Sequence, residues 1–210
     1  GAVIELCFAL GHMGTTNAIT TLEKIAADTD FNIRQAAVEA LVEAGAKTST
    51  AKLIKYALKG DKNATKVALV GATQLGSAND LANLDRLASG SNELKPILAK
   101  ERLRLVAAQE CGSKIACWQG KLSDTSYRIR EKAALELGWL KSKDSLNALM
   151  KVVDDEKAVV RLAAIQSLSR LQKGNLEKLK HIYKSSKSKI EFNRSNHALK
   201  RLIAQLENAV

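Results

Sequence analysis

The chain has 210 residues, with 33 lysines and arginines against 22 aspartates and glutamates, and therefore a net charge of +11. An apolar fraction of 46% excludes wholesale disorder, while three Phe, three Tyr, two Trp and one Pro argue against an all-β fold. The abundance of Ala, Leu and Lys predicts helices, and no apolar run approaches the ~20 residues of a membrane span.

The chain opens with residues 2–10, which are apolar apart from Glu5 and end in Leu10 and Gly11. This stretch matches the second half of a helix that recurs later, where Leu137 and Gly138 close the same pattern. The Asp and Arg that begin the later copies have no counterpart here. We therefore expect the first repeat to be truncated and the chain to be a fragment of a longer protein.

Three segments, beginning at Asp28, Asp124 and Asp155, share one pattern: an aliphatic residue five positions later, Arg at six, Ala at nine and Leu at thirteen. Such self-similarity at a period of about 32 residues is typical of stacked helical repeats. An ion-pair ladder between neighbouring turns is expected to hold the stack together. Its members would be Asp28, Arg34, Asp124, Arg130, Asp155 and Arg161.

Each unit is predicted to be a helix, a short turn and a second, shorter helix. Asp30, Asp124 and Asp155 are expected to cap the first helices. Gly45, Gly76 and Gly138 lie near helix ends, where a left-handed residue is favourable. We expect one domain over residues 1–210, an irregular repeat at about 92–122 around Pro96, regular repeats at 123–154 and 155–186, and a terminal helix at about 189–208.

These strings resemble the HEAT-like repeats, specifically the short subtype found in phycobilisome lyases of bacteria. The resemblance implies an all-α, right-handed α-solenoid of about six helical-hairpin repeats, with first helices on the convex side and second helices on the concave side. In such proteins the Asp/Arg pair is architectural. The family consists mostly of scaffolds for protein recognition and includes a few enzymes, so the fold alone does not decide the function.

Basic residues recur in the second helices, two positions after the central apolar residue, as in Leu22 and Lys24. We use the name second-helix cations for Lys24, Lys55, Arg86, Lys151 and His181, which share this spacing, and for Lys121, which lies beside Leu122 and is expected to take the same place in the irregular repeat. On the concave side they would form a basic ridge for an acidic protein segment. The alternative is that they only offset the helix dipole, which is worth ~0.3–1 kcal/mol each.

The positive charge is concentrated late in the chain. Residues 1–90 hold 9 basic and 9 acidic side chains, whereas residues 91–210 hold 24 and 13. This asymmetry leaves a second function open, the binding of nucleic acid or another polyanion through the C-terminal half, including Lys200 and Arg201. Scarce aromatic residues and the excess of Lys over Arg favour the scaffold instead.

Cys111 and Cys117 are separated by five residues that include Gly112 and Ser113. A turn there would allow a disulfide, which indicates an extracytoplasmic location, periplasmic or secreted; similar cysteine pairs in extracytoplasmic bacterial HEAT-like proteins add weight. The alternative is two reduced thiols in a cytoplasmic protein. Cys7 lies in an apolar helix and is expected to be a core residue.

No catalytic or metal-binding motif stands out. His12 is far in sequence from His181 and His197, so the three are not expected to share a metal, and no cofactor is predicted. We therefore expect a non-catalytic, monomeric scaffold that binds an acidic protein partner; a lyase-type enzyme subunit is a third alternative.

Overall fold

The structure is a computed structural model that describes residues 1–57, 62–90, 92–141, 143–187 and 194–209. All regular secondary structure within these ranges is helical. The chain divides into two compact units, Gly1–Gly112 and Ser113–Val210, which are described separately below. The predicted all-α fold of repeated helical hairpins is confirmed, whereas the right-handed sense of the solenoid and the single domain stay predictions.

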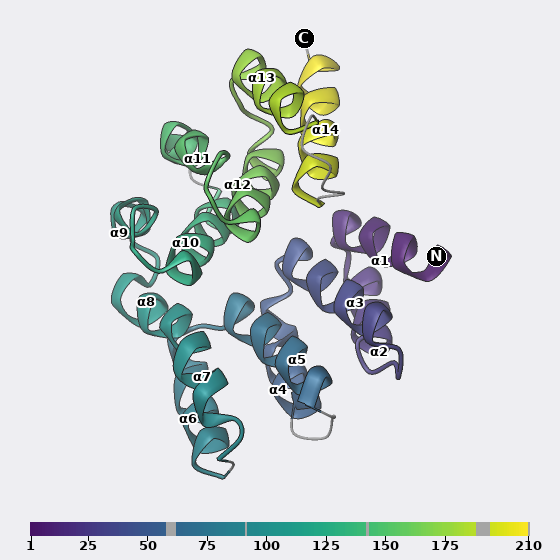
Figure 1. Ribbon diagram of the computed structural model, residues 1–210, viewed down its shortest axis with the longest axis vertical. Coiled ribbons are helices and arrows are strands. Elements are labelled where there is room, and N and C mark those ends of the chain that lie inside the picture. Colours follow the sequence, from purple (N-terminus) through teal and green to yellow (C-terminus); the bar gives the residue numbers. More distant parts are fainter. Residues whose placement is uncertain (58–61, 91, 142, 188–193, 210) are drawn as a thin grey trace. The chain divides into compact units, whose positions relative to one another are not determined.

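The first unit is a succession of helical hairpins. In chain order its helices are α1 (Ala2–Met13), α2 (Thr16–Ile25), α3 (Phe31–Ala44), η1 (Lys47–Ser49), α4 (Thr50–Ala57), α5 (Lys62–Leu75), η2 (Ala78–Asp80), α6 (Leu81–Ser89), α7 (Lys95–Glu101) and α8 (Leu103–Cys111). The first helices α1, α3 and α5 pack side by side. The second helix α2 packs on α1 and α3, and the second helix α4 packs on α5. Their placement can be followed in Figure 1.

Small residues set the spacing of these first helices. A Cβ atom on Gly11 of α1 would lie 2.8–2.9 Å from Ala40 of α3, so only a glycine fits at this crossing. On α5, a Cβ atom on Gly71 would lie 2.3 Å from Val38 Cγ1 of α3. The alanines that recur in the repeat are therefore packing residues, since they allow neighbouring helices to approach closely.

The irregular repeat differs from the others in its first helix, which is broken in two. Pro96 lies at the start of α7, which ends at Glu101. Arg102 separates α7 from α8, which begins at Leu103. Leu98 and Leu105, one on each half, are both buried. The helix thus keeps its apolar anchors although its backbone is interrupted, which explains why the repeat pattern is weak in this part of the sequence.

The second unit has two layers of helices, visible in Figure 1. Its helices are α9 (Ile115–Lys121), α10 (Tyr127–Trp139), η3 (Lys143–Ser145), α11 (Leu146–Val152), α12 (Ala158–Leu171), α13 (Leu176–Lys187) and α14 (Arg194–Glu207). The helices α10, α12 and α14 pack in sequence, and α9, α11 and α13 lie against them. Residues 189–193 of the expected terminal helix lie outside the described residues.

Two expectations about the starts of the first helices need correction. Asp30 does cap α3, since its side chain accepts from the backbone N–H groups of Asn32 and Ile33. The N-cap positions of α10 and α12 are instead Ser126 and Lys157. Asp124 and Asp155 lie two residues earlier and accept from the N–H of the N-cap residue at 2.8 Å, as Asp28 does from Asp30.

The glycines near helix ends also have two different roles. Gly45 has φ 66° and ends α3 in the expected left-handed conformation. Gly138 lies inside α10, and the positive φ of that turn belongs to Lys141. Gly76 likewise has no positive φ. At Gly138 the absence of a side chain serves close packing, because a Cβ atom there would lie 2.3 Å from the Ser167 Oγ of α12.

Candidate protein-interaction surface

The second-helix cations of the first unit are exposed at the ends of their helices. Lys24, Lys55 and Arg86 each occupy the last turn of α2, α4 and α6. All three side chains are exposed. Each therefore offsets the negative end of its helix dipole, and each also presents its charge to solvent.

In the second unit these cations are less uniform. Lys121 and Lys151 occupy the last turns of α9 and α11, with Lys121 half-buried and Lys151 exposed. His181 is exposed but lies in the middle of α13, away from its C-terminus. A helix-dipole role therefore fits five of the six cations and not His181.

A buried glutamate fastens α2 to α4 and so brings Lys24 and Lys55 onto neighbouring helices. The Glu23 carboxylate accepts from Ser49 Oγ at 2.7 Å and from Lys52, and its backbone carbonyl accepts from the Tyr56 hydroxyl at 3.1 Å. Burial raises the pKa of Glu23, but the hydrogen bonds from Lys52 and Ser49 outweigh it and the pKa falls below its ordinary value. Glu23 is thus ionised and structural.

The same contact recurs between α9 and α11. Gln119 follows Trp118 as Glu23 follows Leu22, and its amide donates to Ser145 Oγ at 3.1 Å. Ser145 lies four residues before Leu149, as Ser49 lies four before Leu53. Both serines are fully buried. The second helices are therefore held together by a repeated polar contact that the sequence analysis did not identify, although the recurring Ser and Leu spacing could have indicated it.

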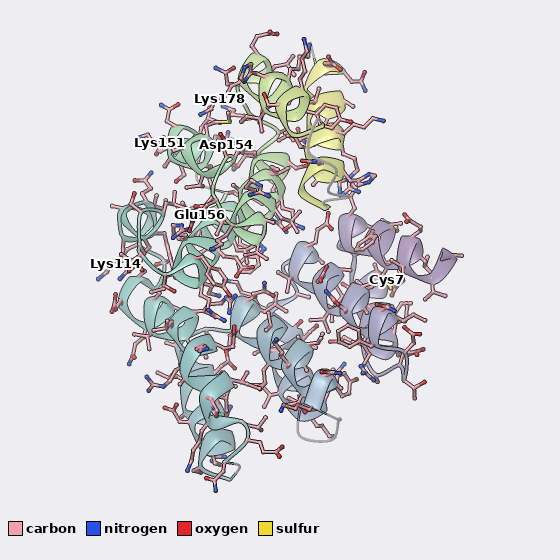
Figure 2. The ribbon with its side chains drawn as sticks, viewed as in Figure 1. Cys7, Lys114, Lys151, Asp154, Glu156 and Lys178 are labelled. Carbon is pink, nitrogen blue, oxygen red and sulfur yellow. The ribbon has the colours of Figure 1, made fainter. Side chains whose placement is uncertain are left out.

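Between α11 and α13 the contact is a lysine at a helix end. Lys178 Nζ donates to the Met150 carbonyl at 2.9 Å, where α11 is about to end. Lys151 follows Met150, and His181 lies one helical turn beyond Lys178. Figure 2 shows Lys151 and Lys178 on the side of this unit that carries the second helices. Lys178, which the sequence analysis did not select, thus joins α13, which carries His181, to the end of α11, which carries Lys151.

The predicted arginine ladder has two kinds of hydrogen bond. Each arginine donates from Nη1 to two carbonyls of the turn before its own helix: Arg34 to Asp28 and Thr29 at 3.0 and 3.1 Å, Arg130 to Asp124 and Thr125 at 3.0 and 3.2 Å, and Arg161 to Asp155 and Glu156 at 2.7 and 3.2 Å. These bonds hold the turn within one repeat, and so these arginines serve the architecture.

Arg130 also reaches the next repeat. Its Nε and Nη2 donate to the two carboxylate oxygens of Asp155 at 2.8 and 2.9 Å. Burial raises the pKa of Asp155, but the hydrogen bonds from Arg130 and the Lys157 N–H outweigh it, so the pKa lies below its ordinary value. The same pairing raises the pKa of Arg130.

Charge separates the two units sharply. Gly1–Gly112 contains 13 basic and 12 acidic residues, and Ser113–Val210 contains 20 and 10, so the units carry +1 and +10. Basic side chains exposed on α13 and α14 include His181, Lys184 and Lys200. The second unit therefore carries nearly all of the net positive charge of the chain.

The cysteines have distinct states. Cys111 and Cys117 are each disulfide-bonded, and Cys7 is free. Cys7 is fully buried on α1, and burial raises the pKa of its thiol. Its place in the core makes it a packing residue.

The described residues show neither a metal-binding cluster nor a membrane-spanning helix. No group of three or more His, Cys, Asp or Glu side chains is placed to hold a metal ion there. None of the described helices has both the length and the apolar composition needed to cross a membrane.

The fold and these contacts define an all-α protein of stacked helical hairpins. A model of the HEAT repeats matches residues 4–72 and 118–200, which is more than half of the chain. The chain belongs to the HEAT-repeat family. Repeat proteins of this kind use their stacked helices as extended surfaces for binding other proteins.

Known structures that resemble the chain share little sequence with it. Human deoxyhypusine hydroxylase in complex with glycerol is 18% identical with a TM-score of 0.49, over 98% of this chain and 79% of that one. A designed armadillo repeat protein in complex with the peptide (KR)4 is 16% identical with a TM-score of 0.39, over 98% of both chains. An engineered protein is 16% identical with a TM-score of 0.38, over 99% of this chain and 97% of that one. No curated protein sequence matches the chain.

Proposed function

We propose that this protein is a non-catalytic scaffold that binds an acidic segment of a partner protein across its second helices. The observation that carries the proposal is the recurrence of exposed cations there, in particular Lys24 and Lys55 on α2 and α4, and Lys151 on α11. These helices are fastened to one another by Glu23 and Lys178. Charged groups held on a rigid base lose less entropy on binding than free side chains do.

Acidic side chains fit this surface better than any other protein chemistry. A carboxylate close to an ammonium group contributes about 1.5 kcal/mol or more to binding when the pair is partly desolvated, which is about tenfold in affinity. The concave position of the second helices, which the family resemblance implies, would allow an extended segment to contact several of them.

Fluorescence anisotropy with a labelled peptide of glutamate and serine tests the proposal, and the same peptide with glutamine in place of glutamate is the reference. We expect Lys24→Glu with Lys55→Glu, and separately Lys151→Glu with His181→Glu, to weaken binding of the acidic peptide at least tenfold. The control is Lys62→Glu with Lys66→Glu, at exposed positions of a first helix, α5; it changes the charge as much as the Lys24 and Lys55 pair does, and by one unit more than the Lys151 and His181 pair. Equal losses in the control and test variants would contradict a site on the second helices.

The +10 charge of Ser113–Val210 favours a second candidate, the binding of nucleic acid or another polyanion. Binding of this type falls steeply with salt because condensed counterions are released. Titration of labelled duplex DNA at two salt concentrations discriminates the two functions. DNA binding that is tighter than peptide binding, and that is abolished by Lys200→Glu with Arg201→Glu, would support the polyanion function over the scaffold.

A further inference from the structure

The side chains that join successive second helices differ in charge from one pair of helices to the next. Between α2 and α4 the joining side chain is the anionic Glu23, and between α9 and α11 it is the neutral Gln119. Between α11 and α13 it is a cation, Lys178. The contact between α11 and α13 therefore adds positive charge to the second-helix surface, whereas the contact between α2 and α4 adds a carboxylate that pairs with Lys52.

The ammonium group of Lys178 is held in a fixed place at the end of α11. Its Nζ donates to the Met150 carbonyl at 2.9 Å in a partly buried hydrogen bond. An ammonium group has three N–H donors, and this bond uses one of them, which leaves two that an anion could accept. Because the side chain is already ordered, binding an anion here costs less conformational entropy than binding it on a free lysine.

Other exposed cations lie around this ammonium group. Lys151 directly follows Met150 on α11. On α13, His181 lies three residues after Lys178, which makes the two side chains neighbours on the helix surface. We call Lys151, Lys178 and His181 the α11/α13 cation cluster. It combines one cation of fixed position with two that are free to adjust to a ligand.

Two exposed carboxylates oppose the cluster. Glu177 precedes Lys178 in sequence, and Asp154 comes shortly after the end of α11. Figure 2 shows Lys151, Asp154 and Lys178 around this end of the helix. The carboxylates weaken the long-range attraction of an anion, so the ligand that gains most is one that contacts the cations directly through several oxygens.

A phosphate monoester meets this requirement better than a carboxylate does. It carries a charge of about −1.5 to −2 at pH 7 and offers three acceptor oxygens, whereas a carboxylate carries one charge and offers two oxygens. One phosphate group could accept from the two remaining N–H groups of Lys178 and still present an oxygen to Lys151.

We propose that the acidic partner segment contains a phosphorylated serine or threonine, and that the α11/α13 cation cluster binds its phosphate group. This inference rests on the proposed function, because it names one residue type within the segment that the second helices bind. Lys178 is the central donor, and Lys151 and His181 flank the phosphate.

Fluorescence anisotropy with two labelled peptides tests the inference in the full chain. One is the peptide of glutamate and serine, and the other has phosphoserine in place of one central glutamate. We expect the native chain to bind the phosphoserine peptide about fivefold or more tightly than the glutamate peptide. Lys178→Gln should reduce this ratio to below about twofold, whereas Lys55→Gln, an exposed cation of α4, should leave the ratio unchanged.

Two further variants separate phosphate binding from the packing of α13. Lys151→Gln keeps the bond between Lys178 and Met150, and it should also reduce the ratio. Glu177→Gln should increase the ratio, because it removes a carboxylate next to Lys178. Equal affinity of the native chain for the two peptides would overturn the inference and leave the proposed function intact, whereas failure of both peptides to bind would overturn both. A preference for phosphoserine that persisted in both Lys178→Gln and Lys151→Gln would also overturn the inference.

Discussion

Gly138 on α10 lies directly against Ser167 on α12, and the Ser167 hydroxyl donates to the Ala134 carbonyl of α10 at 2.6 Å. Ser167 therefore makes both a tight van der Waals contact, with Gly138, and a buried hydrogen bond, to Ala134, between consecutive first helices. Ser167 and Ala134 are fully buried, so this hydrogen bond is shielded from water.

Gly138→Ala is expected to destabilise the second unit by about 1–3 kcal/mol, since the new methyl group has no room beside Ser167. Gly120→Ala is the matched control, because Gly120 lies in α9 with open space around its Cβ position. The control should gain up to about 1 kcal/mol from the higher helix propensity of alanine. Thermal unfolding followed by circular dichroism measures both changes. Equal effects of the two substitutions would show that the crossing is looser than described.

Asp155→Asn is expected to lower the free energy of unfolding at pH 7 by about 2–3 kcal/mol, because the Arg130 guanidinium loses a charged acceptor. The lowered pKa of Asp155 means that its contribution is present above the ordinary value of 3.8 and is lost as the pH falls through the folded-state pKa. The difference from the native chain should therefore close as the pH falls from 5 toward about 2.

Urea unfolding at several pH values measures the effect of Asp155→Asn. Glu156→Gln is the control, since Glu156 is 71% exposed and its contact with Arg130 is longer, at 3.4 Å. It should change the free energy of unfolding by less than about 0.5 kcal/mol. A pH-independent loss in Asp155→Asn would contradict the linkage to the carboxylate.

Ser49→Ala and Ser145→Ala should each lower the free energy of unfolding by about 1 kcal/mol, because each removes a hydrogen bond that joins successive second helices, buried at Ser49 and partly buried at Ser145. Thr48→Ala, at the exposed neighbouring position of η1, should have little effect. Urea unfolding gives all three values. If Ser49→Ala matched Thr48→Ala, the bond to Glu23 would contribute nothing to stability.

The thiols provide a chemical test. Denatured under non-reducing conditions, the chain should present one reactive thiol, that of Cys7, and three after reduction. Reduction of the native protein should lower its stability by about 2 kcal/mol, as expected when a short covalent loop is opened. Three reactive thiols before reduction, in protein purified without a reductant, would contradict the disulfide and remove the argument for an oxidising compartment.

The recurring spacing of Asp, Arg, Ala and Leu was enough to predict the helical repeat. Stacking requires small residues such as Ala at the same position of each unit, and this requirement leaves a regular pattern in the sequence. Gly138 was misassigned to a left-handed turn because sequence alone does not reveal which helix crosses it. Asp124 and Asp155 were misassigned as caps because an N-cap and a carboxylate two residues earlier both bond to backbone N–H groups near the helix start. A residue count from the first apolar position does not separate these two roles.

The candidate surface was predicted in part. The spacing from Leu22 to Lys24 and from Leu149 to Lys151 selected exposed residues in the last turns of their helices. Lys178 could not be selected in this way, because its place depends on how α13 crosses the end of α11. Contacts between helices that belong to different repeats are decided by packing, which a local pattern does not encode.

The arginines that bind the carbonyls of their own turn affect how easily such an array can gain or lose repeats. Main-chain carbonyls are present whatever the residue, so Arg34, Arg130 and Arg161 can brace turns of unlike sequence. A duplicated gene segment would carry the arginine that stabilises its own turn. The other residues of that turn could then be substituted without loss of its conformation. Lengthening or shortening such an array is then a matter of copying or deleting DNA, with little need for compensating substitutions elsewhere.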